Sequence, residues 1–133
     1  MSIPAKPILE KGGKIVGKDI FLAFSPERID PGNSFYSFNN TPKLVGGIDR
    51  ASAEKAAAFF EKAIDAEVKI VSSCETAEMS KMVENTFRYI NIAFMDEVSL
   101  LCKKMNVDVF EVVKAASSKP YGFIPFYPNI HIG

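Results

Sequence analysis

Residues 73–105 contain neither glycine nor proline, and this uninterrupted run constrains the fold more than any other feature of the chain. Its apolar side chains recur in steps of three and four, which places them on one face of an α-helix: Met79, Met82, Val83, Phe87, Ile90, Phe94, Val98 and Leu101. A helix of about 30 residues is on the order of 45 Å long, which exceeds ordinary globular helices. We therefore predict a helix over 75–105 that joins two domains and forms a homodimer with a second copy.

The first half of the chain has the pattern of an α/β sheet. Three short, mostly apolar runs predict strands: 18–24, 43–49 and 67–73. Four prolines and glycines interrupt the loop between the first two runs. An alanine-rich helix over 49–64, with Asp49 or Ser52 as its N-cap, precedes the third. The order strand, loop, strand, helix, strand predicts part of an α/β fold.

The second half reads as helical. A further helix is predicted over 108–118, ending before Pro120, and a loop-like tail follows it. We place the boundary near Ser72, where the α/β pattern ends. The predicted parts are 1–72, 73–120 and 121–133.

Composition excludes several classes of function. The 16 basic side chains equal the 16 acidic ones, so the sequence predicts no binding to nucleic acid or to an anionic membrane surface. No run approaches the roughly 18 apolar residues of a membrane span. Cys74 and Cys102 have neither zinc-ligand spacing nor a disulfide framework, so we predict no metal site and a reducing, cytoplasmic compartment.

Lys81 and Asn85 lie four residues apart, on one face of the predicted long helix. An ammonium and an amide together supply hydrogen-bond donors that stabilise a developing oxyanion where water is excluded. From the spacing alone a solvated helix face explains the pair better. Asn85 weakens that explanation, because asparagine is unfavourable inside a helix unless its side chain has a partner. Arg88 and Tyr89 lie near the same face one turn later.

Glu27 follows the first predicted strand, a position where α/β sheets often carry functional groups. It could act as a general base or orient a water molecule. Its loop context alone favours a simpler explanation, an ion pair with Arg28 or Lys43.

The nucleophile candidates are weaker. Cys74 begins the long helix, whose dipole could lower the pKa of the thiol, but a small buried side chain is the simpler interpretation for it and for Cys102. His131 has no visible partner for a catalytic triad. No glycine-rich phosphate loop of the dinucleotide or Walker type is present.

Four segments in register resemble the UDP-glucose/GDP-mannose dehydrogenase family. They are "FSPERIDPG", "KLVGG", "TAEMSKMVENTFRYINIAFMDEVSLLCKKMNVD" and "FIPFYPNIHIG". "PER", where UDP-glucose enzymes tend to have "PEF", is closer to the branch that oxidises UDP-N-acetylhexosamines of the mannosamine or glucosamine type. The resemblance extends over nearly the whole chain from about Ile15.

The resemblance implies an oxidoreductase of polysaccharide precursor synthesis. Such enzymes oxidise the C6 alcohol of a UDP-sugar to a carboxylate, in two hydride transfers to two NAD+. They have two Rossmann-like domains joined by a long helix that forms the dimer core. This chain would then carry the end of the NAD-binding domain, the central helical domain and the start of a linker toward the UDP-sugar-binding domain.

The resemblance also implies roles for single residues. Lys81 and Asn85 match the helix pair that stabilises the alkoxide and the later oxyanions. Glu27 matches a loop glutamate that serves as acid/base or orders water for thioester hydrolysis, and we expect it to contact the cofactor. Three further residues are predicted to contact the substrate: Arg28, Arg88 and Tyr89.

Two parts of the family pattern are missing from the sequence, the nucleophilic cysteine and the dinucleotide-binding fingerprint. The nucleophilic cysteine lies in a "GG-x-C" segment, and the chain stops at "HIG", where that segment should begin. Neither Cys74 nor Cys102 matches it. Two other interpretations stay open: a β-hydroxyacid dehydrogenase relative, although "TAEMSK" lacks the glycine-rich turn of that family, and a non-catalytic helical dimerisation module.

We expect the chain to be catalytically inert by itself, because it has no thiol to form the covalent intermediate and no glycine-rich cradle for a pyrophosphate. Mixing it with NAD+ and candidate UDP-sugars should give no rise in NADH absorbance. Sustained NADH formation above background would contradict this expectation.

Overall fold

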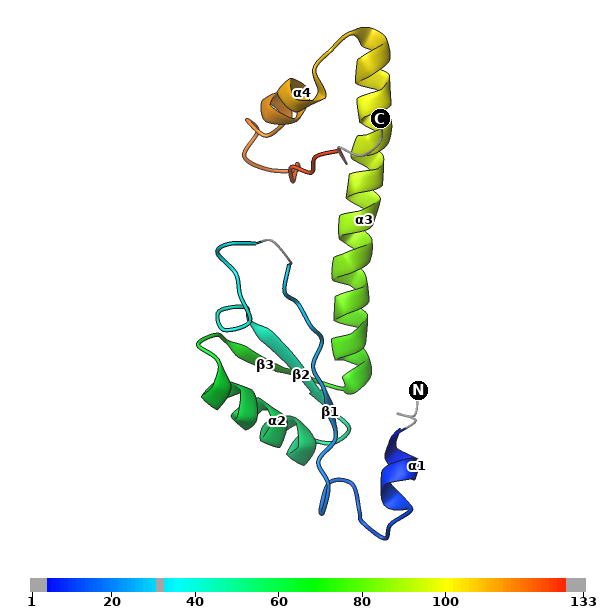
Figure 1. Cartoon of the computed structure of the whole chain (residues 1–133), viewed down its shortest axis with the longest axis vertical. Coiled ribbons are helices and arrows are strands. Elements are labelled where there is room, and N and C mark those ends of the chain that lie inside the picture. Colours follow the sequence, from blue (N-terminus) through cyan, green and yellow to red (C-terminus); the bar gives the residue numbers. More distant parts are fainter. Residues whose placement is uncertain (1–4, 31–32, 129–133) are drawn as a thin grey trace. The chain divides into compact units, whose positions relative to one another are not determined.

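The computed structural model describes residues 5–30 and 33–128. The chain divides into two compact units, Met1–Val83 and Glu84–Gly133, and each is considered by itself. The elements follow in the order α1 (Ala5–Glu10), β1 (Ala23–Phe24), β2 (Lys43–Gly47), α2 (Arg50–Ala63), β3 (Val68–Val71), α3 (Cys74–Met105) and α4 (Val109–Ala116) (Figure 1).

The first unit contains a mixed three-stranded sheet in the order β1-β2-β3. β1 runs antiparallel to β2, with Ala23 opposite Gly47, and β3 runs parallel to β2, with Ile70 opposite Val45. Val45, at the centre of the middle strand, is fully buried. The three predicted strands are therefore present, with β2 between the other two.

The first strand is much shorter than the predicted run 18–24. Residues 15–20 form a turn instead, in which the Asp19 and Ile20 N–H groups donate to the Ile15 carbonyl at 2.8 and 3.3 Å. The Asp19 carboxylate accepts the Ile15 N–H at 2.9 Å, and Gly17 has a φ of 91°, which favours glycine. The Asp19 side chain and the positive φ of Gly17 thus stabilise a turn where the apolar run predicted an extended strand.

Helix α2 covers one face of the sheet and packs against all three strands (Figure 1). Asp49 is its N-cap, with a carboxylate oxygen 2.7 Å from the Ser52 N–H. Ser52, the other predicted cap, is fully buried, and its Oγ accepts the Leu22 N–H at 3.1 Å. Asp49 therefore caps the helix, whereas Ser52 binds the backbone next to β1.

Two consecutive glycines let both larger helices approach β2. A Cβ on Gly46 would overlap the carbonyl of Ser73 and lie 2.8 Å from the Cys74 Cα, and one on Gly47 would overlap the backbone of the first turn of α2. Successive strand residues face opposite sides of a sheet. The pair of glycines therefore admits the start of α3 on one side and α2 on the other.

Helix α3 is continuous from Cys74 to Met105, as predicted. The Ser73 Oγ accepts the Thr76 N–H at 3.1 Å and caps its first turn. Its end at Asn106 has a φ of 55°, and the Val107 N–H donates to the Cys102 carbonyl at 2.9 Å, a Schellman-type ending.

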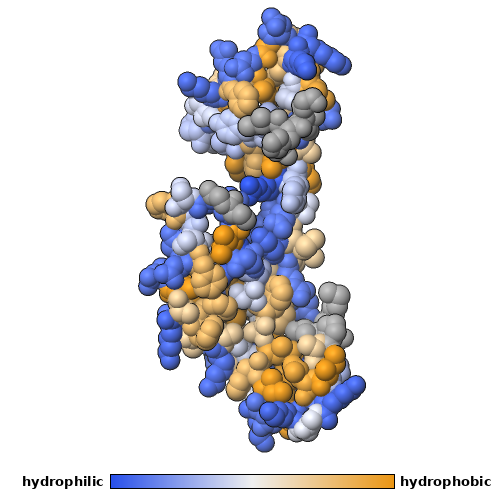
Figure 2. Space-filling view, viewed as in Figure 1, coloured by the Kyte–Doolittle hydropathy of each residue, from blue (hydrophilic) through white to orange (hydrophobic). Residues whose placement is uncertain are grey.

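In the second unit, α4 begins after the N-cap Asp108 and buries Val113. Two buried apolar residues of α3 belong to the same unit, Met95 and Cys102. Helix α1, in contrast, has no buried residue, and Figure 2 shows apolar surface over it. Within residues 5–30 and 33–128, no helix is both long and apolar enough to cross a membrane.

We predict that Gly46→Ala lowers the free energy of unfolding of the first unit by about 1–3 kcal/mol or more, because the new methyl group overlaps backbone that cannot rotate away. Gly12→Ala is the matched control, since a Cβ there meets nothing within 4 Å. Its effect should stay within about 0.5 kcal/mol. Urea unfolding followed by circular dichroism measures both; equal stabilities would contradict the proposed contact.

Candidate functional site

Glu27 lies on the loop after β1 and is held by donors from two segments. Its Oε1 accepts the N–H groups of Arg28 at 2.7 Å and Ile29 at 2.8 Å. The Lys43 Nζ, at the start of β2, lies 3.2 Å from Oε2 and 3.4 Å from Oε1. The structure thus pairs Glu27 with Lys43, one of the two partners that its loop context suggested.

This environment keeps Glu27 ionised. Partial burial by itself raises the pKa of the carboxyl, but the N–H groups of Ile29 and Arg28, together with the Lys43 ammonium, outweigh it and lower the pKa below its ordinary value. A carboxylate with a lowered pKa is a weak proton acceptor. The surroundings of Glu27 therefore suit an ionised carboxylate that accepts hydrogen bonds.

The sequence reasoning did not anticipate how strongly Lys43 is enclosed. Its side chain is 3% exposed, whereas that of Glu27 is 57% exposed. The Nζ lies 4.3 Å from the centroid of the Phe38 ring, a cation–π contact. A lysine at the first position of a short strand gave no sequence signal for this arrangement, because the contact depends on the fold of the preceding loop.

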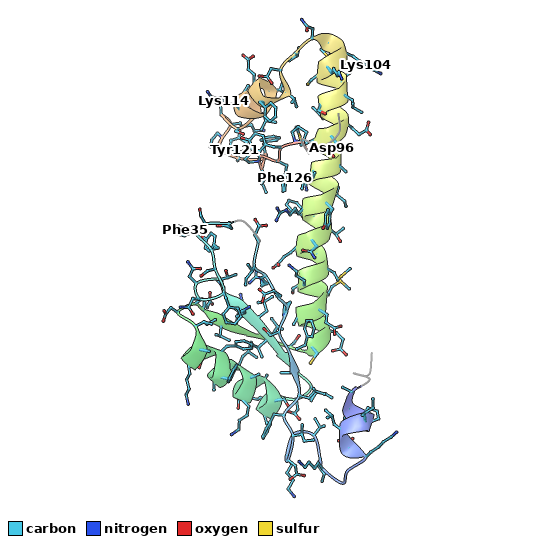
Figure 3. The ribbon with its side chains drawn as sticks, in the orientation of Figure 1. Phe35, Asp96, Lys104, Lys114, Tyr121 and Phe126 are labelled. Carbon is cyan, nitrogen blue, oxygen red and sulfur yellow. The ribbon has the colours of Figure 1, made fainter. Side chains whose placement is uncertain are left out.

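Asparagine side chains shape the loop that carries Phe38. The Asn33 Oδ1 accepts the Phe35 N–H at 3.0 Å, and the Asn40 Nδ2 donates to the Phe35 carbonyl at 2.7 Å. Figure 3 shows Phe35 on this loop. Arg28 closes the other side, since its Nη1 donates to the carbonyl of Pro42 at 2.9 Å. This contact of Arg28 is with the protein backbone beside Lys43.

Lys81 and Asn85 lie four residues apart on α3, but the boundary between the two compact units falls between them, after Val83. Lys81 is half-buried and comes one turn after Ala77, which is fully buried. Asn85 is exposed. In the described part of the chain, neither side chain makes a hydrogen bond or ion pair with another residue, so the structure brings together Glu27 and Lys43 and leaves these two donors uncommitted.

Arg88 and Tyr89 lie on α3 within the second unit, and both are exposed, Tyr89 to 70%. The same unit contains a cavity of about 380 Å³ that the sequence reasoning did not predict. Phe87 and Phe126 line it and meet edge to face, with ring centroids 5.7 Å apart. Phe126 projects from the loop after α4 (Figure 3). The sequence signal that could have indicated this cavity is the aromatic residues between prolines in that loop.

A larger cavity of about 660 Å³ lies at the carboxyl ends of β2 and β3. Its lining includes residues that follow these strands: Asp49, Arg50, Ser72 and Ser73. Because β1 runs antiparallel to β2, Glu27, which follows β1, lies at the amino end of β2, opposite to this cavity. Size alone therefore does not identify the site of the chemistry.

The hypothesis of a reactive Cys74 thiolate is wrong. The residue is 2% exposed, its Sγ donates to the Gly46 carbonyl at 2.9 Å, and burial raises the pKa of the thiol. Cys102 is also buried, and both cysteines are free of disulfides, so the simpler interpretation holds for each. His131 lies outside the described residues.

Within residues 5–30 and 33–128, no group of three His, Cys, Asp or Glu side chains could hold a metal ion. The glycines with positive φ in that part of the chain are Gly13, Gly17 and Gly122, and none lies in a strand-to-helix turn. These residues do not fit the pyrophosphate of a dinucleotide, which needs such a turn.

Comparison with known proteins gives a consistent answer. Residues 75–133 match the central domain of the UDP-glucose/GDP-mannose dehydrogenase family. Over 125 residues, 93% of this chain, it is 38% identical to protein CapL of Staphylococcus aureus and 35% identical to the UDP-N-acetyl-D-glucosamine 6-dehydrogenase of Pseudomonas aeruginosa. The chain spans 29% of the length of each relative.

A solved structure, the UDP-D-ManNAc dehydrogenase of Pyrococcus horikoshii, superposes with a TM-score of 0.84 at 31% identity. The superposition covers 96% of this chain and 30% of the other. It confirms the predicted fold class, a partial Rossmann-like α/β sheet followed by a long helix and a helical segment. The sequence matches and this superposition agree, and residues 75–133 belong to the central domain of the UDP-glucose/GDP-mannose dehydrogenase family.

Proposed function

We propose that this chain supplies catalytic residues to an NAD-dependent UDP-sugar 6-dehydrogenase, which oxidises the C6 alcohol of a UDP-N-acetylhexosamine to a carboxylate. The observation that carries the proposal is the pair Lys81 and Asn85, four residues apart on a continuous helix and inside the segment that matches the family's central domain. The names of the relatives from Pseudomonas and Pyrococcus support the class of substrate.

The proposed roles follow from the chemistry of each group. Oxidation of an alcohol and of a hydrated or thiol-bound aldehyde develops negative charge on the reacting oxygen. The Lys81 ammonium and the Asn85 amide are donors for that charge. Glu27, ionised and held by Lys43, would accept a hydrogen bond from the water that releases the acid. NAD+ would accept the hydride and would contact Glu27, and Arg28, Arg88 and Tyr89 would contact the substrate.

We further propose a domain order and a homodimer. Residues 1–72 would end the NAD-binding domain, 73–120 form the central domain, and 121–133 lead toward the UDP-sugar-binding domain. A second copy would cover the apolar face of α3, because five of its large side chains are 60–63% exposed: Met79, Met82, Val83, Ile90 and Phe94. The two free, buried thiols suit a reducing cytoplasm.

The catalytic proposal is tested by grafting the chain into a complete enzyme. Replacing the matching segment of the Pseudomonas 6-dehydrogenase by this chain should retain NADH formation with UDP-N-acetyl-D-glucosamine. In that chimera Lys81→Ala should lower kcat by about 100-fold or more, as loss of an oxyanion donor does. Lys103→Ala, an exposed lysine in the last turn of α3, is the control and should leave kcat within about twofold.

Equal activity of the two variants would overturn the role of Lys81. A chimera that folds but oxidises a β-hydroxyacid instead of any UDP-sugar would favour the β-hydroxyacid dehydrogenase alternative. A folded chimera without any dehydrogenase activity would favour the dimerisation module.

The dimer is tested by sedimentation of the chain itself. The wild-type chain should sediment as a dimer, and Ile90→Glu should shift it to monomer, because a charge placed in a buried apolar contact is strongly unfavourable. Lys104→Glu reverses the charge of an exposed lysine at the end of α3 and should leave the dimer intact. A strictly monomeric wild-type chain would overturn the proposal.

A further inference from the structure

We propose that Lys43 is a positioning residue for Glu27, one whose enclosed ammonium holds the carboxylate in the orientation needed to bind a water molecule. The inference rests on the proposed catalytic role of Glu27. It concerns a residue at the first position of β2 that does not touch the reacting atoms and acts only through its neighbour.

The first argument is the burial of the charge. A lysine side chain that is 3% exposed has lost most of its hydration, and such a charge is rare unless an opposite charge compensates it. The Glu27 carboxylate provides that charge at 3.2 Å, and the Phe38 ring covers the ammonium at 4.3 Å. Arg28, next to Glu27 in the chain, carries a further positive charge, and its Nη1 donates to the Pro42 carbonyl.

The second argument is the division of contacts between the two carboxylate oxygens. The backbone N–H groups of Arg28 and Ile29 both reach Oε1, whereas the shorter contact of Lys43 is to Oε2. Backbone donors alone therefore hold one oxygen and leave the other free to swing. Lys43 contacts both oxygens, so it fixes the plane of the carboxylate.

The third argument is that the arrangement leaves room for a ligand. The Glu27 side chain is 57% exposed although its partner is enclosed, so Lys43 approaches the carboxylate from the protein side. Each carboxylate oxygen has two lone pairs. Oε2 can therefore accept from a water molecule on the open side while Lys43 holds it from the other.

A purely structural ion pair would stabilise the loop and leave chemistry unaffected, so the test separates these two roles. The first measurement is an NMR titration of the Glu27 carboxyl carbon in the 133-residue chain. In Lys43→Met the pKa of Glu27 should rise by about half a unit to one unit, because an adjacent positive charge is lost from a partly exposed carboxylate. Lys43→Arg should restore most of the difference, and Lys69→Met, an exposed lysine on β3, should change nothing.

The second measurement uses the chimeric dehydrogenase. Lys43→Met should lower kcat about tenfold with KM within twofold, and the acidic limb of its pH profile should move upward with the pKa of Glu27. Lys43→Arg should recover most of kcat. In a Glu27→Gln background, Lys43→Met should have no further effect on kcat, because the two residues would act as one unit.

Three results would overturn the proposal. They are an unchanged pKa of Glu27 in Lys43→Met, an unchanged kcat and pH profile despite a shifted pKa, or additive effects of the two substitutions. Full activity of Glu27→Gln would instead show that the catalytic role of Glu27 is wrong, while the titration would still report the contact. If Lys43→Met melts well below the wild-type chain, Lys43→Arg is the variant that tests the proposal, since arginine keeps the charge but changes its reach and geometry. Failure of Lys43→Arg to recover most of kcat would then overturn the proposal.

Discussion

The close approach of α3 to the middle strand at Gly46 is the contact on which the first unit depends. No side chain fits between the strand and the backbone at Ser73 and Cys74, and the Cys74 thiol donates to the Gly46 carbonyl itself. Interiors packed at this density transmit a displacement of one element directly to its neighbour. The contact at Gly46 therefore fixes the position of the first turn of α3 against the middle strand.

The opposite end of the same strand carries the ion pair with Glu27. β2 begins with Lys43, whose ammonium holds Glu27, and ends with the two glycines that admit α2 and α3. Because β1 is antiparallel to β2, the loop after β1 returns to the Lys43 end of the strand. The five residues of β2 thus separate an electrostatic contact at one end from a steric contact at the other. Substitutions at the two ends should therefore change different measured properties. The charge contact affects the pKa of Glu27, and the glycines affect stability.

Most of the fold follows from local sequence signals. The absence of glycine and proline over 73–105, the cap Asp49, and the apolar runs of β2 and β3 each correspond to an element that the structure contains. The first strand was predicted too long, because an apolar run says nothing about the turn that Asp19 and Gly17 impose. Periodicity reports which side chains are apolar, whereas a turn depends on one side chain reaching one backbone group.

The candidate site was less accessible from sequence, and the reason is physical. Glu27 and Lys43 are 16 residues apart, and nothing in either segment indicates that a folded loop will place a phenyl ring over the ammonium. Lys81 and Asn85 are local in sequence, yet their spacing is shared with countless solvated helices. What distinguishes Lys81 is that it is half-buried and lies one turn beyond the fully buried Ala77. Partial burial reduces the hydration of the Lys81 side chain, and a less hydrated donor interacts more strongly with a developing oxyanion. Packing therefore supports the proposed oxyanion role of Lys81, where spacing alone favoured the surface.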